Sequence, residues 1–401
     1  GGSYPSYTSV GSTVPVSLTW EKSTTYDVGL DLDFFNNRLS VSGDYYRRYT
    51  TDMYTASVAL PAVYGTGSPK GNNAEMKTDG WELSLSWRDS FKLGGKPFDY
   101  SIKAMVWDNR TVVTKYENAT RSLGTLKGYI QNGGSPSDFY EGMELGEMWG
   151  YTVAGLFRDQ ADIDSSATHD FTQASDKVTR PGQVKIADLD GNGFIDPGNF
   201  AVDDHGDLRI IGNQSPRYRY GVNLSARWNG IGLSVFLQGV GARDWYPGSD
   251  AGMFWGKYGR PFFALIPSIH NYTDDMYSAE RNNWDTAYWP RMTTYQSNGT
   301  KNWTRLLEIP NTRYIQSAAY LRVKNIQLDY SFPKHICSAI RLQGLKIYVN
   351  AENLFTFTPL HKYAPNFDPE GLSYDSDFAS AADGYTYPIL KSVTVGVNIT
   401  F

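Results

Sequence analysis

The stretch from Ser392 to Phe401 constrains the fold most, because its side chains alternate without a break. Every odd position is apolar, and every even position is small or polar. Period-two alternation of this kind predicts a β-strand with one apolar and one polar face. Soluble sandwiches and outer-membrane barrels both accommodate such a strand, so the rest of the chain has to separate the two architectures.

The same alternation recurs along the chain and predicts an antiparallel all-β protein with nine clear strands, or about 9–11 when weaker stretches are counted. The turn Asn229-Gly230 is a strong signal for a two-residue hairpin. The eight stretches before the last one cover residues 27–34, 39–45, 81–87, 98–106, 220–228, 233–237, 320–332 and 345–355.

Short turns alternate with long connections, and this rhythm favours the barrel. Turns near 36–37, 94, 229–230 and 333–343 alternate with long loops at 51–78, 109–216, 240–317 and 358–388. Outer-membrane barrels combine short periplasmic turns with long extracellular loops. Aromatic residues near strand ends suit either interfacial girdles or a buried core, namely Trp20, Trp87, Trp107, Trp228 and Phe332.

An odd number of strands cannot close the even-stranded barrel that is usual for a single bacterial chain. The sequence therefore predicts that residues 1–401 form the C-terminal portion of a larger barrel, with residue 1 in an extracellular loop. No signal peptide precedes the first strand, and we expect the native N-terminus to lie further upstream.

Composition excludes several classes of protein. The net charge is −5 and no basic stripe offsets it, which argues against a nucleic-acid partner. Nothing approaches the roughly 18–20 apolar residues of a transmembrane helix. The single cysteine, Cys337, excludes an internal disulfide framework. Five scattered histidines show no metal-ligand or triad spacing, so the sequence does not predict an enzyme.

Several stretches, in order and nearly end to end, resemble the SusC/RagA family of TonB-dependent outer-membrane transporters. The strings are Trp20-Glu21-Lys22 with Tyr26–Asp31, Gly80–Leu85, Tyr320–Leu328 with Tyr330–Pro333, Ala351–Thr356 with Asp368-Pro369-Glu370, and Tyr387-Pro388 with Gly396–Phe401. Asn282-Asn283-Trp284 and Ala287–Arg291 also resemble a family stretch. Each string is weak alone, whereas the order and spacing together are specific.

The resemblance implies part of a barrel of about 22 strands in a Gram-negative outer membrane. It also implies TonB-driven import of oligosaccharides or peptides, with a SusD-like surface lipoprotein as a lid over the loops. The family's plug domain is not visible in this chain and would belong, with the remaining barrel, to the missing N-terminal part. Outer-membrane lipid would surround the wall.

The sharpest local motif is an Asp-rich stretch that resembles an EF-hand-type loop. Its oxygen ligands would come from Asp188, Asp190, Asn192, the Phe194 backbone and Asp196, with Gly193 at the sharp turn. Position 12 is an asparagine, so Asp203 or Asp204 would have to supply the missing carboxylate. A Ca²⁺ that fastens the loop is one interpretation, and an Asx-rich turn satisfied by its own backbone is the other.

The loop over 240–317 is rich in aromatic residues that could stack on sugar rings or contact a partner. The candidates are Trp245, Tyr246, Trp255, Tyr258, Trp284 and Trp289. A long loop also needs a small core of its own, and aromatic side chains supply one. Both interpretations are open at this point.

The rival class is a soluble, secreted β-rich protein that binds or degrades carbohydrate. The two classes differ on the outward faces of the strands. A barrel requires these faces to be apolar and free of charge at mid-depth, whereas a soluble protein tolerates Arg or Lys there.

Overall fold

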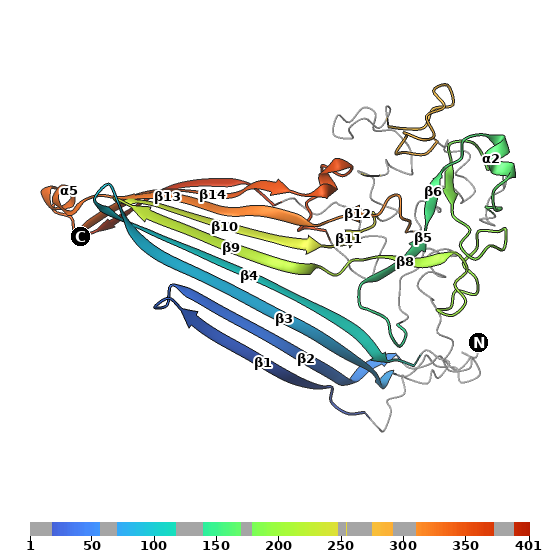
Figure 1. Ribbon diagram of the computed structural model, residues 1–401, viewed down its shortest axis with the longest axis horizontal. Coiled ribbons are helices and arrows are strands. Elements are labelled where there is room, and N and C mark those ends of the chain that lie inside the picture. The colour runs from blue at the N-terminus through green and yellow to red at the C-terminus, as the bar shows by residue number, and fades with distance from the viewer. Residues whose placement is uncertain are drawn as a thin grey trace, which may run out of the picture.

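The computed structural model describes residues 18–56, 70–117, 139–169, 179–247, 254, 275–291, 310–372 and 389–401. Nine strands of this part form one antiparallel sheet in the order β1-β2-β3-β4-β9-β10-β13-β14-β15 (Figure 1). The strands are β1 (Lys22–Phe34), β2 (Leu39–Ala56), β3 (Lys70–Leu93), β4 (Lys96–Lys115), β9 (Arg217–Trp228), β10 (Ile231–Ala242), β13 (Tyr320–Ser331), β14 (Gly344–Phe357) and β15 (Ser392–Thr400). All nine predicted strands are confirmed, and the terminal one lies at an edge of the sheet.

The short connections lie together at one end of the sheet, which we call the turn end (Figure 1). Gly94-Gly95 and Asn229-Gly230 have positive φ at both positions, as a two-residue hairpin of type I′ requires. Asn36 and Asn37 also have positive φ in the β1–β2 turn. Between β13 and β14 the chain forms the short helix α5 (Lys334–Ala339).

The long connections lie together at the opposite end, which we call the loop end (Figure 1). They contain three small two-stranded sheets, a short helix and a 3₁₀ turn. These elements are β5 (Glu147–Tyr151) with β8 (Leu208–Asn213), β6 (Val153–Leu156) with β7 (Val184–Ile186), β11 (Asp244–Trp245) with β12 (Gln316–Ser317), α2 (Gln160–Asp164) and η4 (Pro359–Lys362). Among the described residues no helix is both long and apolar enough to cross a membrane.

The strands extend further than the alternation indicates, so the predicted loop bounds need correction. The connection expected over 51–78 narrows to residues 57–69, because β2 ends at Ala56 and β3 begins at Lys70. Register shifts beside Met53 and a positive φ at Asp52 break the alternation there without ending the pairing. Likewise β4 continues to Lys115, and the regions expected as loops over 109–216 and 240–317 contain the small sheets.

The two faces of the sheet differ sharply in chemistry. One hydrogen-bonded row crosses all nine strands and is apolar at every position, and we call it the apolar row. The adjacent row on the other face is polar from β3 to β15, and we call it the polar row. The apolar row is Phe34, Leu39, Trp87, Ile102, Leu224, Val235, Ile326, Ala351 and Val393, and the polar row is Arg88, Ser101, Ser225, Ser234, Gln327, Asn350 and Thr394.

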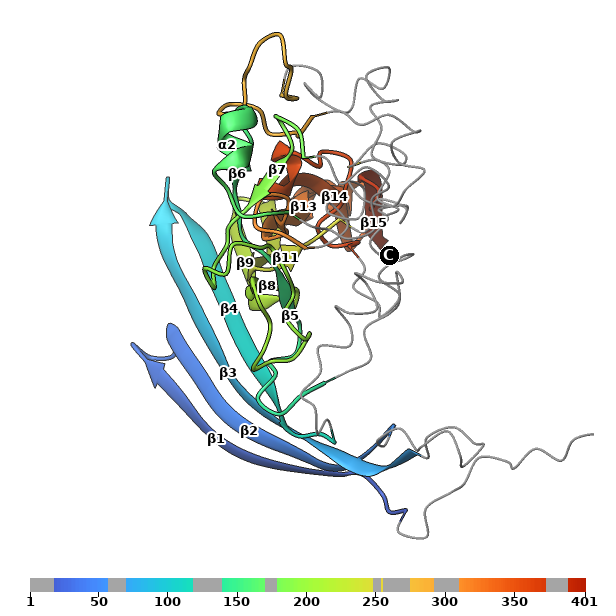
Figure 2. The ribbon, with the colours of Figure 1, turned by 90° about the vertical axis from the view of Figure 1, so that its right-hand side faces the viewer.

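Seen from the loop end, the sheet is curved like part of a cylinder wall (Figure 2). Polar side chains line two hollows of the sheet. Because a curved sheet forms hollows on its concave face, the polar row lies on that face. The apolar row therefore faces outward, and its side chains are free of charge across the middle of the sheet. This is the arrangement that a membrane barrel requires and that a soluble protein has no reason to keep.

Candidate functional site

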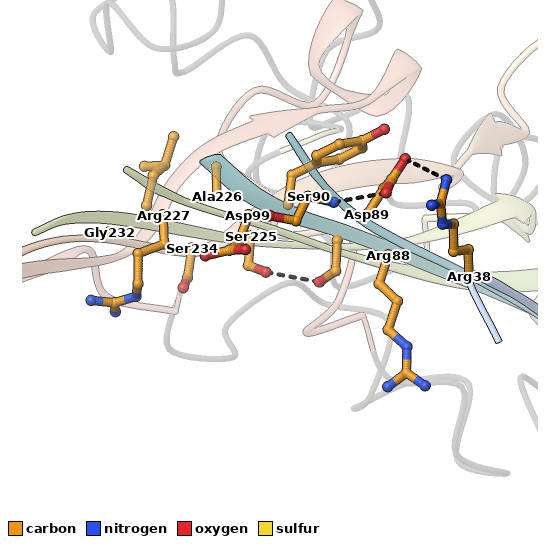
Figure 3. A pocket seen from close by; sticks show the side chains of 13 residues that line it. Arg38, Arg88, Asp89, Ser90, Asp99, Ser225, Ala226, Arg227, Gly232 and Ser234 are labelled. Atoms are coloured by element: carbon orange, nitrogen blue, oxygen red, sulfur yellow. Dashed lines mark hydrogen bonds and ion pairs between the residues drawn. The ribbon is translucent and has the colours of Figure 1, made fainter. Parts of the chain in front are cut away.

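The larger hollow of the sheet lies on the polar side of β3, β4, β9 and β10, near the turn end (Figure 3). Its volume is about 600 Å³, and serine and arginine side chains dominate its lining. Ser101 and Ser225 share a hydrogen bond of 2.8 Å across β4 and β9. Such a surface binds water and other hydroxyl-bearing molecules rather than apolar ones.

The charges of this hollow are partly neutralised by the wall itself. Arg38 lies 3.5 Å from Asp89, and Arg227 lies 3.2 Å from Asp329, which is nearly fully buried. Lys346 contacts the same Asp329 carboxylate at 3.3 Å from the other side. The wall therefore presents balanced charge, and hydroxyl groups cover the surface between the ion pairs.

A second hollow of about 340 Å³ follows on β13, β14 and β15. Amide side chains dominate it, and Asn325 donates to Asn350 at 2.8 Å. Its lining consists of Asn325, Gln327, Lys346, Tyr348, Asn350, Thr394 and Asn398. Amides donate and accept hydrogen bonds equally well, so this part of the wall suits neutral polar chains.

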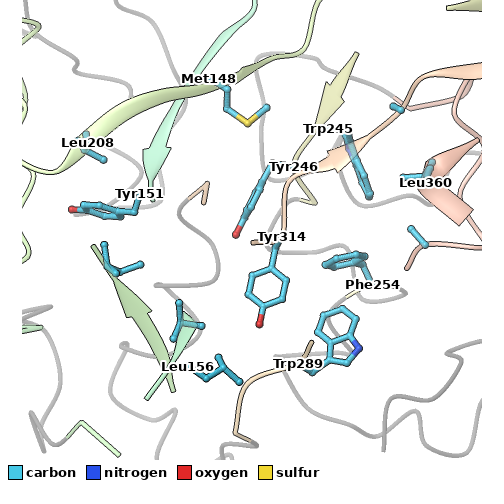
Figure 4. Packing of buried hydrophobic residues seen from close by; sticks show 14 of the residues in the cluster. Met148, Tyr151, Leu156, Leu208, Trp245, Tyr246, Phe254, Trp289, Tyr314 and Leu360 are labelled. Carbon is cyan, nitrogen blue, oxygen red and sulfur yellow. The ribbon is translucent and has the colours of Figure 1, made fainter. Parts of the chain in front are cut away.

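At the loop end, the long connections share one hydrophobic core, which we call the loop-end cluster (Figure 4). Backbone hydrogen bonds join Tyr151 to Pro310 and Thr312, so segments far apart in the sequence lie side by side. Asn311 is buried there and donates to the Tyr246 hydroxyl at 2.7 Å. The largest fully buried members include Trp245, Tyr151, Tyr246, Tyr314, Phe254, Leu156, Leu208 and Leu360.

This cluster decides between the two interpretations of three predicted aromatic residues. Trp245, Tyr246 and Trp289 are at most 3% exposed and pack inside it, so they form a core and present no face to a ligand. Trp284 is partly buried against the same cluster. Trp255 and Tyr258 lie outside the described residues.

An ion network attaches the loop-end cluster to the wall. Arg322 on β13 is 3% exposed and bonds Asp368 at 2.5 Å and Glu370 at 2.7 Å. Lys324 reaches the other Glu370 oxygen at 2.8 Å. Burial of the Asp368 carboxyl raises its pKa, but hydrogen bonds from the Glu370 amide and from Arg322 outweigh burial and hold the pKa below its usual range. The carboxylate is therefore charged, and the segment after η4 is held against the wall.

The Asp-rich stretch folds into a tight loop that its own backbone satisfies in part. The Asp188 carboxylate accepts hydrogen bonds from the amides of Gly191 at 2.7 Å and Gly193 at 2.9 Å. Slight burial raises the pKa of Asp188, yet these amides lower it below the usual range. The Asn192 side chain donates to both Asp190 and Asp196.

Three carboxylates converge at this loop, and one of them was not predicted. Oxygens of Asp188, Asp190 and Asp207 lie within 4.8 Å of one another. Asp207 is fully buried and accepts from the amides of Leu189 at 2.6 Å and Asp196 at 3.0 Å. Asp207 follows Asp196 by 11 residues in the sequence, a spacing that matches no known metal-binding loop. The sequence therefore gave no indication that Asp207 joins this group.

The other predicted ligands make contacts within the loop. The Phe194 amide donates to the Asn192 side chain at 2.7 Å, and the Phe194 ring is exposed. Asp204, expected as a substitute for the missing carboxylate, pairs instead with Asn199. Asp203 does not belong to the group of converging carboxylates in the described part of the chain.

One histidine of the loop end is held in its neutral form. His169 Nδ1 donates to the Ala167 carbonyl at 2.8 Å, and Nε2 accepts from the Ile186 amide at 2.8 Å. Burial lowers the pKa of His169, and the nearby Lys185 lowers it further against the opposing effect of the Ala167 carbonyl. Protonation of Nε2 would break the bond that joins this segment to β7.

Comparison with known proteins agrees with this architecture. The family described as "TonB dependent receptor-like, beta-barrel" matches residues 1–179. "TonB-dependent receptor P3" of Formosa agariphila is 26% identical over 96% of this chain, and "TonB-dependent receptor SusC" of Bacteroides thetaiotaomicron is 24% identical over 96%. The RagAB peptide transporter structure aligns with 96% of the chain at a TM-score of 0.64 and 20% identity.

By these matches the chain is similar to the TonB-dependent receptors, and its fold is that of a stretch of the receptor β-barrel. Within that class, the resemblance to the SusC/RagA family is confirmed by the relatives named SusC and RagAB. These relatives are named as receptors or transporters rather than enzymes. The chain spans about a third of their length, with 34% of the P3 receptor and 35% of the RagAB chain covered.

Proposed function

We propose that this chain forms part of the wall and the cell-surface loops of an importer in a Gram-negative outer membrane. The observation that carries the proposal is the two-faced sheet, whose apolar row faces outward while its polar row faces the concave side. The segregation of turns and loops to opposite ends supports the same orientation, with the loop end at the cell surface.

The cargo would be a hydrated oligosaccharide or peptide. Hydroxyl and amide side chains line both hollows of the polar face, and the charged groups there are largely paired. Hydrogen bonds to hydroxyl or amide groups of a passing chain can replace water at little cost on such a surface. By analogy with the SusC and RagAB relatives, a SusD-like lipoprotein would cover the loop end and TonB would supply energy.

Two measurements on the intact protein test the proposal. A folded barrel migrates faster on a gel without heating and needs detergent for extraction from membranes. Cells that carry the protein should accumulate a fluorescent oligosaccharide or peptide, and this uptake should stop when the proton-motive force is dissipated. Full solubility in plain buffer would favour the secreted carbohydrate-binding alternative and refute the membrane assignment.

We also propose that the loop around Asp188, Asp190 and Asp207 binds Ca²⁺. Three carboxylates within 4.8 Å repel one another, and a hard divalent cation with oxygen ligands relieves that repulsion. Main-chain carbonyls and water would complete the six to eight ligands that Ca²⁺ requires. The cation would fasten the loop and take no part in transport chemistry.

Terbium luminescence and calcium titration of the intact protein test this site. Asp190→Asn combined with Asp207→Asn should abolish a calcium-sensitive signal, whereas Asp203→Asn serves as a matched control on the same connection. Absence of binding at millimolar Ca²⁺, or equal loss in the control, would show that the loop is an Asx turn satisfied by its own backbone.

A further inference from the structure

The turn end of the sheet is basic. The four turn segments 35–38, 92–97, 229–230 and 332–343 contain no aspartate or glutamate. Their cations are Arg38, Lys92, Lys96, Lys334 and Arg341, all of which are exposed. In an otherwise acidic chain of net charge −5, this end therefore carries a local excess of positive charge.

Most of this charge is not neutralised by neighbouring carboxylates. Arg38 has Asp89 at 3.5 Å, and Lys96 donates to the neutral side chain of Asn229. No ion pair involves Lys92, Lys334 or Arg341 within the part of the chain that the structure describes. These three cations are therefore available to an external anion.

The opposite end has the opposite sign. The described residues of the connection over 116–216 alone include thirteen acidic and four basic ones. The whole chain therefore has no general attraction for anions. An anionic surface would attract the turn end and repel the loop end, and so orient the sheet with its turn end toward that surface.

Exposed apolar side chains lie beside the cations of the turn end. Phe35 is 66% exposed and Ile340 on the α5 side is 53% exposed, and Phe91, Leu93 and Ile336 are exposed as well. The Phe91 ring lies 5.0 Å from Phe98, which continues the outward apolar face toward its end. The turn end is therefore the border at which an apolar face meets a ring of cations.

We propose that the turn end binds the phosphate groups of anionic phospholipids in the inner leaflet of the membrane. The inference rests on the proposed function, because it takes the outward face as the lipid-facing one. A soluble anionic partner would explain the cations but not the adjoining apolar side chains. Phospholipids satisfy both, with phosphate groups at exposed cations such as Lys92, Lys334 and Arg341 and acyl chains beside exposed apolar residues such as Phe91 and Ile340.

The test compares two variants of the intact receptor that lose the same number of charges. The turn variant carries Lys92→Gln, Lys96→Gln, Lys334→Gln and Arg341→Gln. The control removes four exposed cations at the loop end, through Lys70→Gln, Lys115→Gln, Arg158→Gln and Lys391→Gln. Delipidated protein is titrated with phosphatidylglycerol, phosphatidylethanolamine or lipid A, and bound lipid is counted by native mass spectrometry.

We expect the wild type and the control to retain phosphatidylglycerol over phosphatidylethanolamine. The turn variant should lose this preference by about tenfold or more, since it lacks four of the cations that attract an anionic surface. Equal binding by the turn variant and the wild type would overturn the proposal. Selective loss of lipid A binding would overturn the choice of the inner leaflet.

Heat-modifiable migration of each variant separates this inference from the proposed function. A turn variant that migrates as a folded barrel and loses lipid preference supports the inference. A wild type that shows no heat-modifiable migration contradicts the barrel itself. A folded turn variant with unchanged lipid preference contradicts only the phospholipid site.

Discussion

Replacing Val235 with arginine tests the assignment of the two faces of the sheet, because Val235 lies in the middle of the apolar row. It pairs with Leu224 on one side and Ile326 on the other. The preceding residue, Ser234, belongs to the polar row and lines the hollow of about 600 Å³. Val235→Arg and Ser234→Arg therefore place the same side chain on opposite faces, one residue apart.

The expected cost follows from the depth of Val235. Eight residue steps separate Ile231 from Gly239 on β10, which at about 3.4 Å a step span about 27 Å along the strand. A strand tilt of about 40° reduces this to a height of about 21 Å, close to the apolar band of about 25 Å in outer-membrane barrels. Val235 lies four steps from either end, at the midplane, where arginine costs about 2–4 kcal/mol.

The measurement is the free energy of unfolding of the intact protein in phospholipid vesicles, followed by tryptophan fluorescence in urea. We expect Val235→Arg to lower it by about 2–4 kcal/mol. Ser234→Arg should change it by about 0.5 kcal/mol, because its side chain enters an open polar hollow. Tolerance of arginine at Val235, together with a larger loss at Ser234, would show that the faces are assigned the wrong way round.

Three further predictions concern single contacts. Arg322→Met should destabilise the segment around Asp368 by about 3–5 kcal/mol, because it leaves a partly buried carboxylate without its cation, and hydrogen exchange of that segment measures the effect. Burial lowers the pKa of His169 in the folded state, so the unfolded chain binds the proton more tightly. The stability of the loop end should therefore fall as the pH drops below about 6.5, and His169→Phe should remove this pH dependence. Gly396→Ala should destabilise the β14–β15 pair because its methyl group would overlap the Tyr348 ring, and Tyr348→Leu should rescue it in a double-mutant cycle.

Local patterns predicted the wall well because each strand is specified by its own residues. The alternation over Ser392–Thr400 defined β15, and Asn229-Gly230 defined the turn between β9 and β10. The prediction failed where pairing continues through an irregularity. At Asp52 the backbone is left-handed, and a bulge there interrupts the alternation of side chains between the two faces. The hydrogen-bonded pairing of β2 with β3 continues past the bulge, so the alternation alone ends the predicted strand too early.

The candidate sites were harder to predict because they depend on contacts between distant segments. Asp207 joins Asp188 and Asp190 only after the chain has returned on itself, and no motif records that return. Composition likewise cannot tell whether an aromatic residue in a long loop faces a ligand or a core. Trp245 and Trp289 satisfy either interpretation in the sequence, and only their burial decides for the core.

The ion network at Arg322 joins two separate strings of the sequence that both resemble the SusC/RagA family. Arg322 belongs to the string on β13, whereas Asp368 and Glu370 belong to the string after η4, and the two meet in one contact. Leu360 of η4 is fully buried in the loop-end cluster, so the network ties that cluster to the polar face of the wall. The apolar face and the backbone hydrogen bonds stabilise the sheet, and a separate hydrophobic core stabilises the loop-end cluster. The ion pairs of Arg322 connect the two and fix the position of the cluster relative to the sheet.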